Sequence, residues 1–429
     1  MVKCVNLQFN CKLTHGVDLV YQYLSRSLEA GIQKATAEFP VVVLVGPRQS
    51  GKTTLLKHLF EAQYKIISLE APDVRLAATD DPRGFLNLFT PPVIFDEIQY
   101  APTLLTFIKE LVDADRNRPG QYILTGSQNL FLMEQVTESL AGRAAVLKLM
   151  PFSRWELAGI PERYLPWEKE AGDNGIGTNL PVQSYTELWT QVLRGYYPEI
   201  ALAAERDSRL WQASYVQTYL ERDLRNLRNI GDLTLFQVFI RALAARCAQI
   251  LNLSELARDI GVSVNTAKAW ISILEASFQI FILRPYFTNI GKRLIKSPKI
   301  YFMDTGLLCY LVGLRDPEHA ASGPLGGAIF ENLVIADLYK IYMHRGEEPP
   351  FYFWRTLAGE EVDLLVEVQN NMIPLEIKIS ETPRKEMVKG LTSFQRDFHG
   401  KVRLGFVIFP GKTSLPLGPN VVTLPLMNM

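Results

Sequence analysis

The sequence predicts an α/β protein whose first half is a parallel sheet wrapped by helices. Short apolar runs of strand length alternate with segments of helical apolar spacing, as in parallel strands joined by crossover helices. The predicted strands are 41–45, 65–69, 92–95 and 121–125, with helices predicted before residue 39, where apolar residues from Leu19 to Ile32 have helical spacing, and over Leu104–Ala114. The composition changes after residue 304, and from residue 323 we expect a second α/β unit that begins with a helix over 330–342.

The overall composition limits the kinds of partner. Lys+Arg and Asp+Glu both number 45, so contact with a nucleic acid has to come from a local basic patch. No uncharged apolar run approaches the roughly 18 residues of a membrane helix, and the N-terminus lacks a secretory apolar core. We therefore expect a cytoplasmic protein with no membrane partner. The four cysteines lack the spacing of metal ligands.

The first predicted strand leads directly into a phosphate-loop motif, Gly46-Pro47-Arg48-Gln49-Ser50-Gly51-Lys52-Thr53, and Thr54 opens the helical run that follows. Glycines in such a loop let backbone N–H groups surround phosphate oxygens, and the helix presents its positive end to the same anion. We expect Lys52 to reach the β and γ phosphates and the Thr53 hydroxyl to bind Mg²⁺. The predicted ligands are therefore a nucleotide, ATP or GTP, and Mg²⁺.

Two carboxylates, Asp96 and Glu97, end the third predicted strand about fifty residues after the loop. Asp96 is expected to hold Mg²⁺ through water, and Glu97 to polarise the water that attacks the γ phosphate. The fourth strand leads to Ser127, a γ-phosphate sensor or an ordinary turn residue. Arg143 would touch the γ phosphate of its own chain, act on a neighbouring subunit of a homo-oligomer, or form a surface salt bridge.

The order of these motifs, from Gly46–Thr53 through Asp96-Glu97 and Thr125-Gly126-Ser127 to Gly142-Arg143 and Pro151-Phe152, resembles a prokaryotic family of AAA-type P-loop ATPases. The resemblance runs from about residue 30 to the C-terminus. Members join the ATPase to a winged helix and a C-terminal domain of unknown function. The resemblance implies ATP as the nucleotide and hydrolysis as the reaction.

The middle of the chain predicts a surface insertion over 151–179, a helical connector over 185–230, and a helix-turn-helix. The two helices are 254–260 and 265–274, and 281–286 and 299–302 would be the strands of a wing. Basic residues without acidic neighbours cluster there: Arg284, Lys292, Arg293, Lys296 and Lys299, with Lys268 on the second helix. This pattern favours contacts with DNA or RNA phosphates, and its alternative is a solvated or docked hairpin.

Near the C-terminus, two predicted strands over 362–366 and 374–379 are joined by a turn at 369–371. Glu376 and Lys378 share one face of the second strand, and Asp363 can meet them across the hairpin. Two carboxylates suit a divalent metal, and the lysine can orient the attacking water. The alternative is a salt-bridged sheet face.

This constellation is similar to the restriction-endonuclease fold, PD-(D/E)XK, although Val362 stands where the name-giving proline often lies. The resemblance implies that Glu331 is the acid of the first helix and that the residues form a nuclease site, with or without retained cleavage.

We therefore predict an ATPase domain over 1–184, a helical connector over 185–232, a winged helix over 233–303 and a restriction-endonuclease-like domain over 304–429. The predicted function is ATP-driven action on DNA, such as remodelling, unwinding or branch migration, with or without metal-dependent cleavage. The alternatives are a regulatory NTPase switch that binds protein partners, and a nuclease regulated by ATP.

Overall fold

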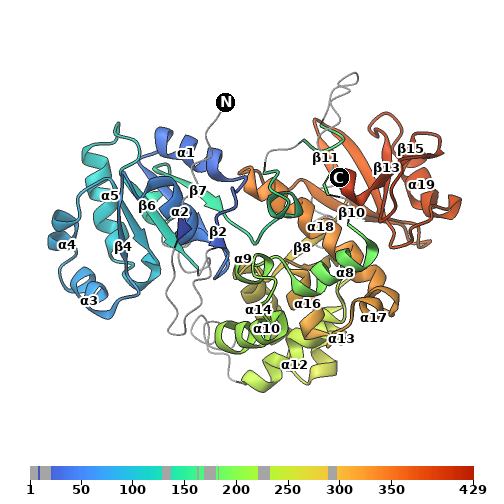
Figure 1. Ribbon diagram of the computed structural model, residues 1–429, viewed down its shortest axis with the longest axis horizontal. Helices are drawn as coiled ribbons and strands as arrows, with labels where there is room; N and C mark the ends of the chain where they lie inside the picture. Colours follow the sequence, from blue (N-terminus) through green and yellow to red (C-terminus); the bar gives the residue numbers. More distant parts are fainter. Residues whose placement is uncertain are drawn as a thin grey trace.

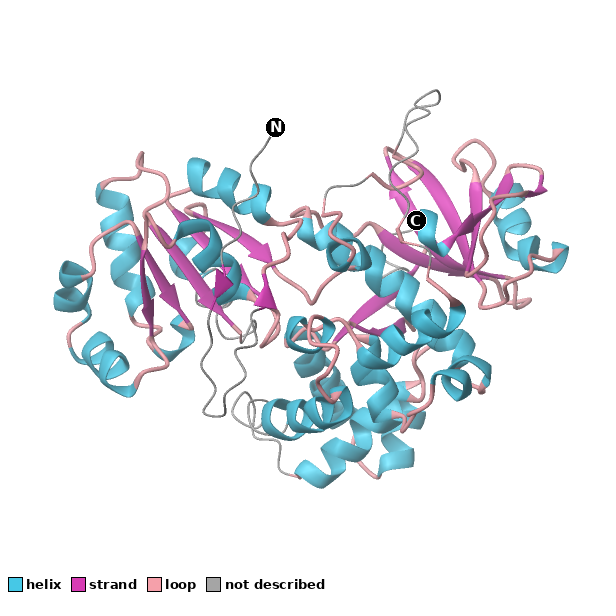
Figure 2. Ribbon diagram, viewed as in Figure 1, coloured by secondary structure: helices cyan, strands magenta, loops and turns pink. Residues whose placement is uncertain are grey.

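The computed structural model describes residues 8–9, 21–127, 136, 138–161, 164–168, 180–181, 183–220, 232–287 and 297–429. The two larger sheets lie in separate lobes on either side of helix α18, and the helices of the middle of the chain gather below them (Figures 1 and 2). The predicted α/β class is confirmed. No helix among these residues has the length and apolar character needed to cross a membrane.

The N-terminal sheet has five strands in the order β4-β5-β6-β3-β7, and every neighbouring pair is parallel. Its strands are β3 (Val41–Val45), β4 (Lys65–Ser68), β5 (Val93–Asp96), β6 (Tyr122–Gly126) and β7 (Ala144–Lys148). The side chains of β3 alternate between the two faces of the sheet, and helices cover both faces. Val42 and Leu44 pack toward α1 (Glu29–Glu38) and α2 (Lys52–Phe60), while the other valines pack toward α5 (Leu104–Ala114).

Four features of this lobe differ from expectation. The helix before β3 begins only at Glu29, because the Glu29 carboxylate accepts bonds from the Tyr23 hydroxyl and the Arg26 N–H, both at 2.7 Å. A short strand, β2 (Tyr21–Gln22), pairs there with β1 (Gln8–Phe9). The polar stretch after β4 forms two helices that begin with proline, α3 (Pro72–Asp80) and α4 (Pro82–Leu88). Strand β7 was not predicted.

The middle of the chain is helical in the part that the structure describes. The elements are η1 (Ile98–Tyr100) in the first lobe, then α7 (Arg154–Leu157), α8 (Tyr185–Arg194), α9 (Pro198–Ala201), α10 (Ser208–Tyr215), the π-helical turn η2 (Val216–Leu220), α12 (Leu233–Ala244), α13 (Leu253–Ile260) and α14 (Val264–Ala276). The predicted helix-turn-helix is confirmed as α13 and α14. Asn252 and Ser263 cap the two helices, and Gly261, with φ of 79°, ends the first.

The C-terminal sheet has eight strands in the order β14-β15-β13-β12-β11-β10-β8-β9. The strands are β8 (Ile280–Pro285), β9 (Lys299–Phe302), β10 (Phe351–Arg355), β11 (Glu361–Val368), β12 (Asn371–Ile377), β13 (Gly405–Phe409), β14 (Pro416–Gly418) and β15 (Val421–Pro425). The two strands expected as a wing, β8 and β9, pair antiparallel, and β8 also pairs parallel to β10. The expected boundary between residues 303 and 304 therefore falls inside one sheet.

The helices of this lobe are α16 (Thr305–Leu311), α17 (Pro317–Ser322), α18 (Gly326–His344) and α19 (Lys389–Asp397), with short turns η3 (Lys385–Val388) and η4 (Leu426–Asn428). Helix α18 is buried along most of its length and contacts β9 and β12 of its own sheet as well as β7 of the N-terminal sheet. Figure 1 shows it between the two sheets. It is therefore the element through which the two lobes are packed together.

Candidate functional site

The phosphate loop lies between the carboxyl end of β3 and the start of α2, as the motif predicts. Gly46 and Gly51 have φ of 157° and 96°, values that residues with a Cβ seldom adopt. A Cβ on Gly46 would also overlap the carbonyl oxygen of Leu149. Ser50 is buried in the same loop, and its hydroxyl has no hydrogen-bond partner among the described residues. An unpartnered buried hydroxyl in such a loop fits a site that receives a phosphate.

Lys52 is buried at the start of α2, and its Nζ donates to the carbonyl oxygens of Gly46 and Pro47, each at 2.9 Å. Burial lowers the pKa of Lys52, and the nearby carboxylates of Glu97 and Asp96 oppose this shift. The ammonium group is thus held across the loop in which a phosphate would bind. Because burial disfavours the charged ammonium, the negative charge of a bound phosphate would stabilise it.

The strand ends bring the predicted hydrolytic residues together. The Thr53 hydroxyl lies 3.0 Å from Asp96 Oδ2, and Thr125 donates to the same carboxylate. Glu97 has φ of 58°, and its Oε2 accepts bonds from the backbone N–H and hydroxyl of Ser127 at 3.1 and 3.0 Å. Threonine and aspartate oxygens are the ligands that Mg²⁺ prefers, so Thr53 and Asp96 fit the ion of a bound nucleotide. Ser127 contacts Glu97 and so orients the predicted base.

A cavity of about 610 Å³ lies over the loop and has a second wall from the helical connector. The first wall includes Arg48, Gln49, Lys52, Thr53, Thr54 and Glu97. The second consists of Glu199 of α9, Trp211, Ser214 and Tyr215 of α10, and Thr218 of η2. Trp211 Nε1 donates to Glu199 at 2.9 Å, so the aromatic and acidic members of this wall fix each other. Helical periodicity predicts the connector but does not mark the residues that face the nucleotide.

Arg143 lies at the opposite end of the sheet, which corrects its assignment to the γ phosphate of its own chain. It directly precedes β7, and its carbonyl accepts from the N–H of Val41 at the start of β3, whereas the loop follows the other end of that strand. The guanidinium instead bonds both oxygens of Asp113 at 2.6 and 2.9 Å. Of the roles considered, only a contact with another subunit or a surface salt bridge is compatible with this position.

A second polar cluster lies on the C-terminal sheet. Asp363 of β11 and Glu376 of β12 meet Lys378, whose Nζ is 3.4 Å from Asp363 Oδ2 and 2.6 Å from Glu376 Oε1. The hairpin brings these three residues together because β11 and β12 pair antiparallel. Glu376 is 8% exposed, and its Oε2 has no partner among the described residues. Burial, and then the charge of Asp363, raises the pKa of Glu376 to about 8.

Glu331 of α18 is near this cluster but has other partners. Its Oε1 lies 3.1 Å from Lys299 Nζ and accepts from the Tyr301 hydroxyl at 2.6 Å. Burial, and then Asp363, raises the pKa of Glu331 to about 7. Among the described residues, no three His, Cys, Asp or Glu side chains are grouped so that they could hold a metal ion. A cation site in this cluster would therefore use Asp363 and Glu376. Glu331 would not take part, because it is paired with Lys299 and Tyr301.

The prediction that Lys299 belongs to a basic wing that contacts nucleic acid is wrong. It is 3% exposed and ion-paired with Glu331 and, at 2.5 Å, with Glu361, so it is not available to a nucleic-acid phosphate on the surface. Lys268 and Arg284 are exposed, as such contacts require. The predicted contacts Lys292, Arg293 and Lys296 lie outside the described residues.

Models of known protein families match three separate segments of the chain. Residues 38–158 match an AAA domain, residues 185–318 a domain of unknown function (DUF8612), and residues 326–429 another domain of unknown function (DUF4143). A solved structure, the Walker-type ATPase PABY2304 of Pyrococcus abyssi, is 17% identical, covering 66% of this chain and 94% of that one, with a TM-score of 0.43.

Two mycobacterial proteins are similar over nearly the whole length. They are the uncharacterized protein Rv2008c of Mycobacterium tuberculosis and the uncharacterized protein Mb2031c of Mycobacterium bovis. Each is 31% identical over 411 residues, which make up 93% of this chain and 83% of the relative. The chain therefore belongs to the family of these mycobacterial proteins, and its N-terminal domain is a P-loop ATPase domain of the AAA type.

Proposed function

We propose that this protein uses ATP hydrolysis to act on DNA, and that nucleotide state changes the position of the helix-turn-helix and the C-terminal domain. The observation that carries the proposal is the cluster of Asp363, Glu376 and Lys378, with the buried and unpartnered Oε2 of Glu376. Two acids beside a lysine suit a cation and a phosphodiester.

The ATP chemistry belongs to the first lobe. Lys52 and the loop N–H groups would bind the β and γ phosphates, and Glu97, held by Ser127, would orient water for attack. Thr53 and Asp96 would hold Mg²⁺, which neutralises phosphate charge when it is bound. A ligand in the cavity also meets α9, α10 and η2, which lead along the chain to α12–α14. Turnover can therefore change contacts of the connector.

The C-terminal order supports a restriction-endonuclease-like fold. Helix α18 is followed by three antiparallel strands, β10 to β12, then by α19 and the parallel strand β13. Likewise, α12–α14 followed by β8 and β9 have the order of a winged helix. Exposed Lys268 and Arg284 would contact phosphates, and Asp363 with Glu376 would hold a divalent ion.

The first test is ATP turnover with and without single-stranded, duplex and branched DNA. We expect at least one DNA form to stimulate turnover, and a Lys52→Ala protein controls for contaminating ATPases. If none changes the rate, action on DNA is excluded. Cleavage is tested separately with Mg²⁺ or Mn²⁺ and labelled DNA, using the parent and Glu376→Ala. Equal cleavage by both proteins would exclude this cluster as its source.

A regulatory switch that binds protein partners is a second candidate function. One observation favours it: Lys378 already pairs with both acids of the C-terminal cluster, and Lys299 pairs with the nearby Glu331 and Glu361. These ion pairs give the cluster a structural role that needs neither a metal nor DNA. A slow turnover that DNA does not change, together with a protein complex that forms only with ATP, would favour the switch.

A further inference from the structure

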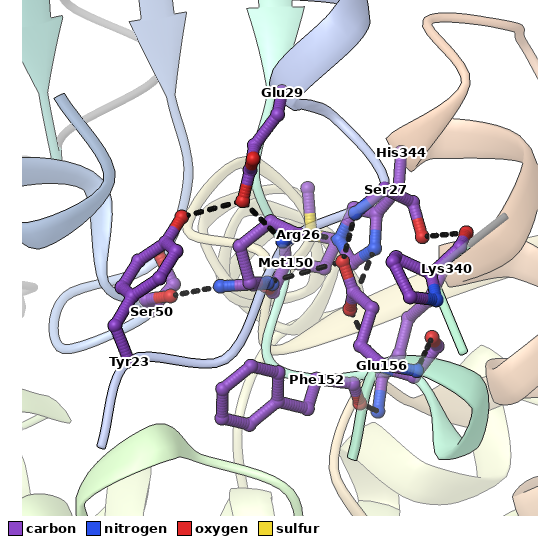
Figure 3. A network of polar contacts seen from close by, with 12 residues as sticks. Tyr23, Arg26, Ser27, Glu29, Ser50, Met150, Phe152, Glu156, Lys340 and His344 are labelled. Carbon is purple, nitrogen blue, oxygen red and sulfur yellow. Dashed lines mark hydrogen bonds and ion pairs between the residues drawn. The ribbon is translucent and has the colours of Figure 1, made fainter. Parts of the chain in front are cut away.

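Arg26 lies directly behind the phosphate loop, in the segment before α1 (Figure 3). Its Nη1 donates to the carbonyl oxygen of Ser50 at 2.9 Å, and its Nη2 donates to that of Met150 at 2.7 Å. The guanidinium also lies over the ring of Phe152, 4.5 Å from the centroid, and the residue is 4% exposed. Three fixed partners hold this group in one orientation.

The bond to Ser50 has a consequence for the phosphate site. In a planar trans peptide, the carbonyl oxygen of Ser50 and the N–H of Gly51 point in opposite directions. Gly51 lines the cavity, whereas Arg26 holds the Ser50 carbonyl on the side away from the cavity. The N–H of Gly51 is therefore directed toward the cavity. Arg26 therefore fixes a peptide that a phosphate oxygen would bind.

Glu156 holds Arg26 from the other side. Its Oε1 accepts from Arg26 Nε at 3.1 Å and from the Ser27 N–H at 2.9 Å, while Oε2 accepts from the Ser153 N–H at 2.9 Å. Glu156 is fully buried. Burial raises the pKa of Glu156, but the charge of Arg26 and the hydrogen bonds to the carboxylate lower it more, so that the carboxylate is ionised.

His344, the last residue of α18, completes the connection. Its Nε2 accepts from the Met150 N–H at 3.0 Å, so the ring proton is on Nδ1, which lies 3.1 Å from Glu156 Oε2. Burial lowers the pKa of His344, in agreement with a neutral ring. Figure 3 shows Ser50, Arg26, Glu156 and His344 as one continuous series of polar contacts.

Two further residues on the same face of α18 hold the same segment. Asp337 Oδ1 accepts from the Arg154 N–H at 2.7 Å, and Lys340 Nζ donates to the Phe152 carbonyl at 3.2 Å. Together with His344 they occupy positions i, i+3 and i+7 of the helix. Segment 150–156 is thus attached to α18, whose earlier turn carries Glu331.

We propose that Arg26 is a positioning residue of the ATP site and that α18 sets its position through His344 and Glu156. The C-terminal domain then controls how well the loop binds phosphate. This inference depends on nucleotide binding by the AAA domain and does not depend on action on DNA.

The test uses Arg26→Met, which keeps most of the side-chain length and removes the donors, and measures the Kd for Mg-ATP and steady-state KM and kcat. We expect Kd and KM to rise about tenfold or more, because the variant loses the hydrogen bond from a charged donor to the Ser50 carbonyl. Unchanged values in a folded Arg26→Met protein would overturn the positioning role, whereas loss of DNA stimulation alone would concern only the proposed function.

The connection to α18 is tested with two substitutions of His344. Asn can donate from the Nδ1 position to Glu156, whereas Gln places its amide nearer the Nε2 position, so His344→Asn should retain a low Kd and His344→Gln should raise it. In an Arg26→Met background, His344→Gln should cause no further rise. The control His399→Gln makes the same change at an exposed histidine outside this series and should leave the Kd unchanged.

Equal Kd values for the two His344 variants would overturn the proposed connection between α18 and Arg26. It would also be overturned if His344→Gln raised the Kd as much in the Arg26→Met background as in the parent. These variants remain informative if Arg26→Met does not fold, because the Asn and Gln pair is compared in the presence of Arg26.

Discussion

At the scale of single residues, the nucleotide site separates binding from chemistry. Lys52 already spans the loop, whereas Glu97 is held by Ser127, which directly follows the neighbouring strand β6. The motif alone assigns both roles, but the structure adds that Ser127 contacts the acid directly. This arrangement lets a substitution of Glu97 change hydrolysis without removing the phosphate contacts.

We expect Lys52→Ala to lose nucleotide binding and turnover, because it removes the cation nearest the phosphates. Glu97→Gln should bind Mg-ATP with an affinity close to that of the parent while kcat falls by about 10²-fold or more, since the amide cannot polarise water. Equilibrium binding and single-turnover hydrolysis measure the two effects. Normal turnover by Glu97→Gln would show that another group orients the water.

The raised pKa of Glu376 predicts a dependence of stability on pH. Because burial raises this pKa from 4.5 to about 8, the folded chain keeps a proton that the unfolded chain releases. The contribution of Glu376 to stability therefore decreases as the pH rises from 4.5 to about 8. In metal-free buffer, Glu376→Gln should lose less thermal stability than the parent over this range.

The matched control for this measurement is the exposed Glu386, replaced by Gln. It should follow the parent at every pH. If the melting temperatures of Glu376→Gln and the parent change in parallel with pH, Glu376 does not titrate as its burial indicates.

At the scale of elements, the ATP cavity joins a sheet domain to a helical connector. The wall from α9 and α10 contains Trp211, which is held by Glu199 and stacks on Tyr215 with a centroid distance of 5.0 Å. A ligand that fills the cavity must alter the surroundings of this indole. The connector can thus report nucleotide binding directly.

We therefore expect Mg-ADP to change the intrinsic tryptophan fluorescence of the parent protein and to cause little change in Trp211→Phe. Trp189→Phe is the matched control, because Trp189 is buried in α8 and does not line this cavity. Loss of the signal in the control but not in Trp211→Phe would contradict the assignment of the wall.

At the scale of the whole molecule, Arg143 tests whether neighbouring subunits complete the site. Within one chain it is at the wrong end of the sheet, so Arg143→Ala should leave turnover of the dilute, monomeric protein unchanged within about twofold. Turnover per subunit is measured over a range of protein concentrations. A fall of about 10³-fold that appears only where the parent self-associates would instead indicate an arginine supplied between subunits.

Asp113→Ala separates these explanations. It removes the salt-bridge partner of Arg143 while keeping the arginine, so any loss that comes from the ion pair itself appears in both variants. A loss confined to Arg143→Ala points to the guanidinium and a second subunit.

The sequence by itself determined the α/β class, the phosphate loop with Asp96 and Glu97, the helix-turn-helix and the β11–β12 hairpin with its acids. These features depend on local spacing: apolar periodicity, glycines between a strand and a helix, and residues two apart on one strand. Local spacing also led to errors. It extended the helix before β3 too far, and it grouped Lys299 with the exposed cations.

Only the tertiary structure decided which distant residues meet. Burial of Lys299 against Glu331, the position of Arg143 at the amino end of the strands, and the wall that contains Trp211 all depend on packing between segments far apart in the chain. The series of Ser50, Arg26, Glu156 and His344 joins residues from position 26 to position 344. No local pattern marks these residues, because their partners are set by how the two lobes pack around α18.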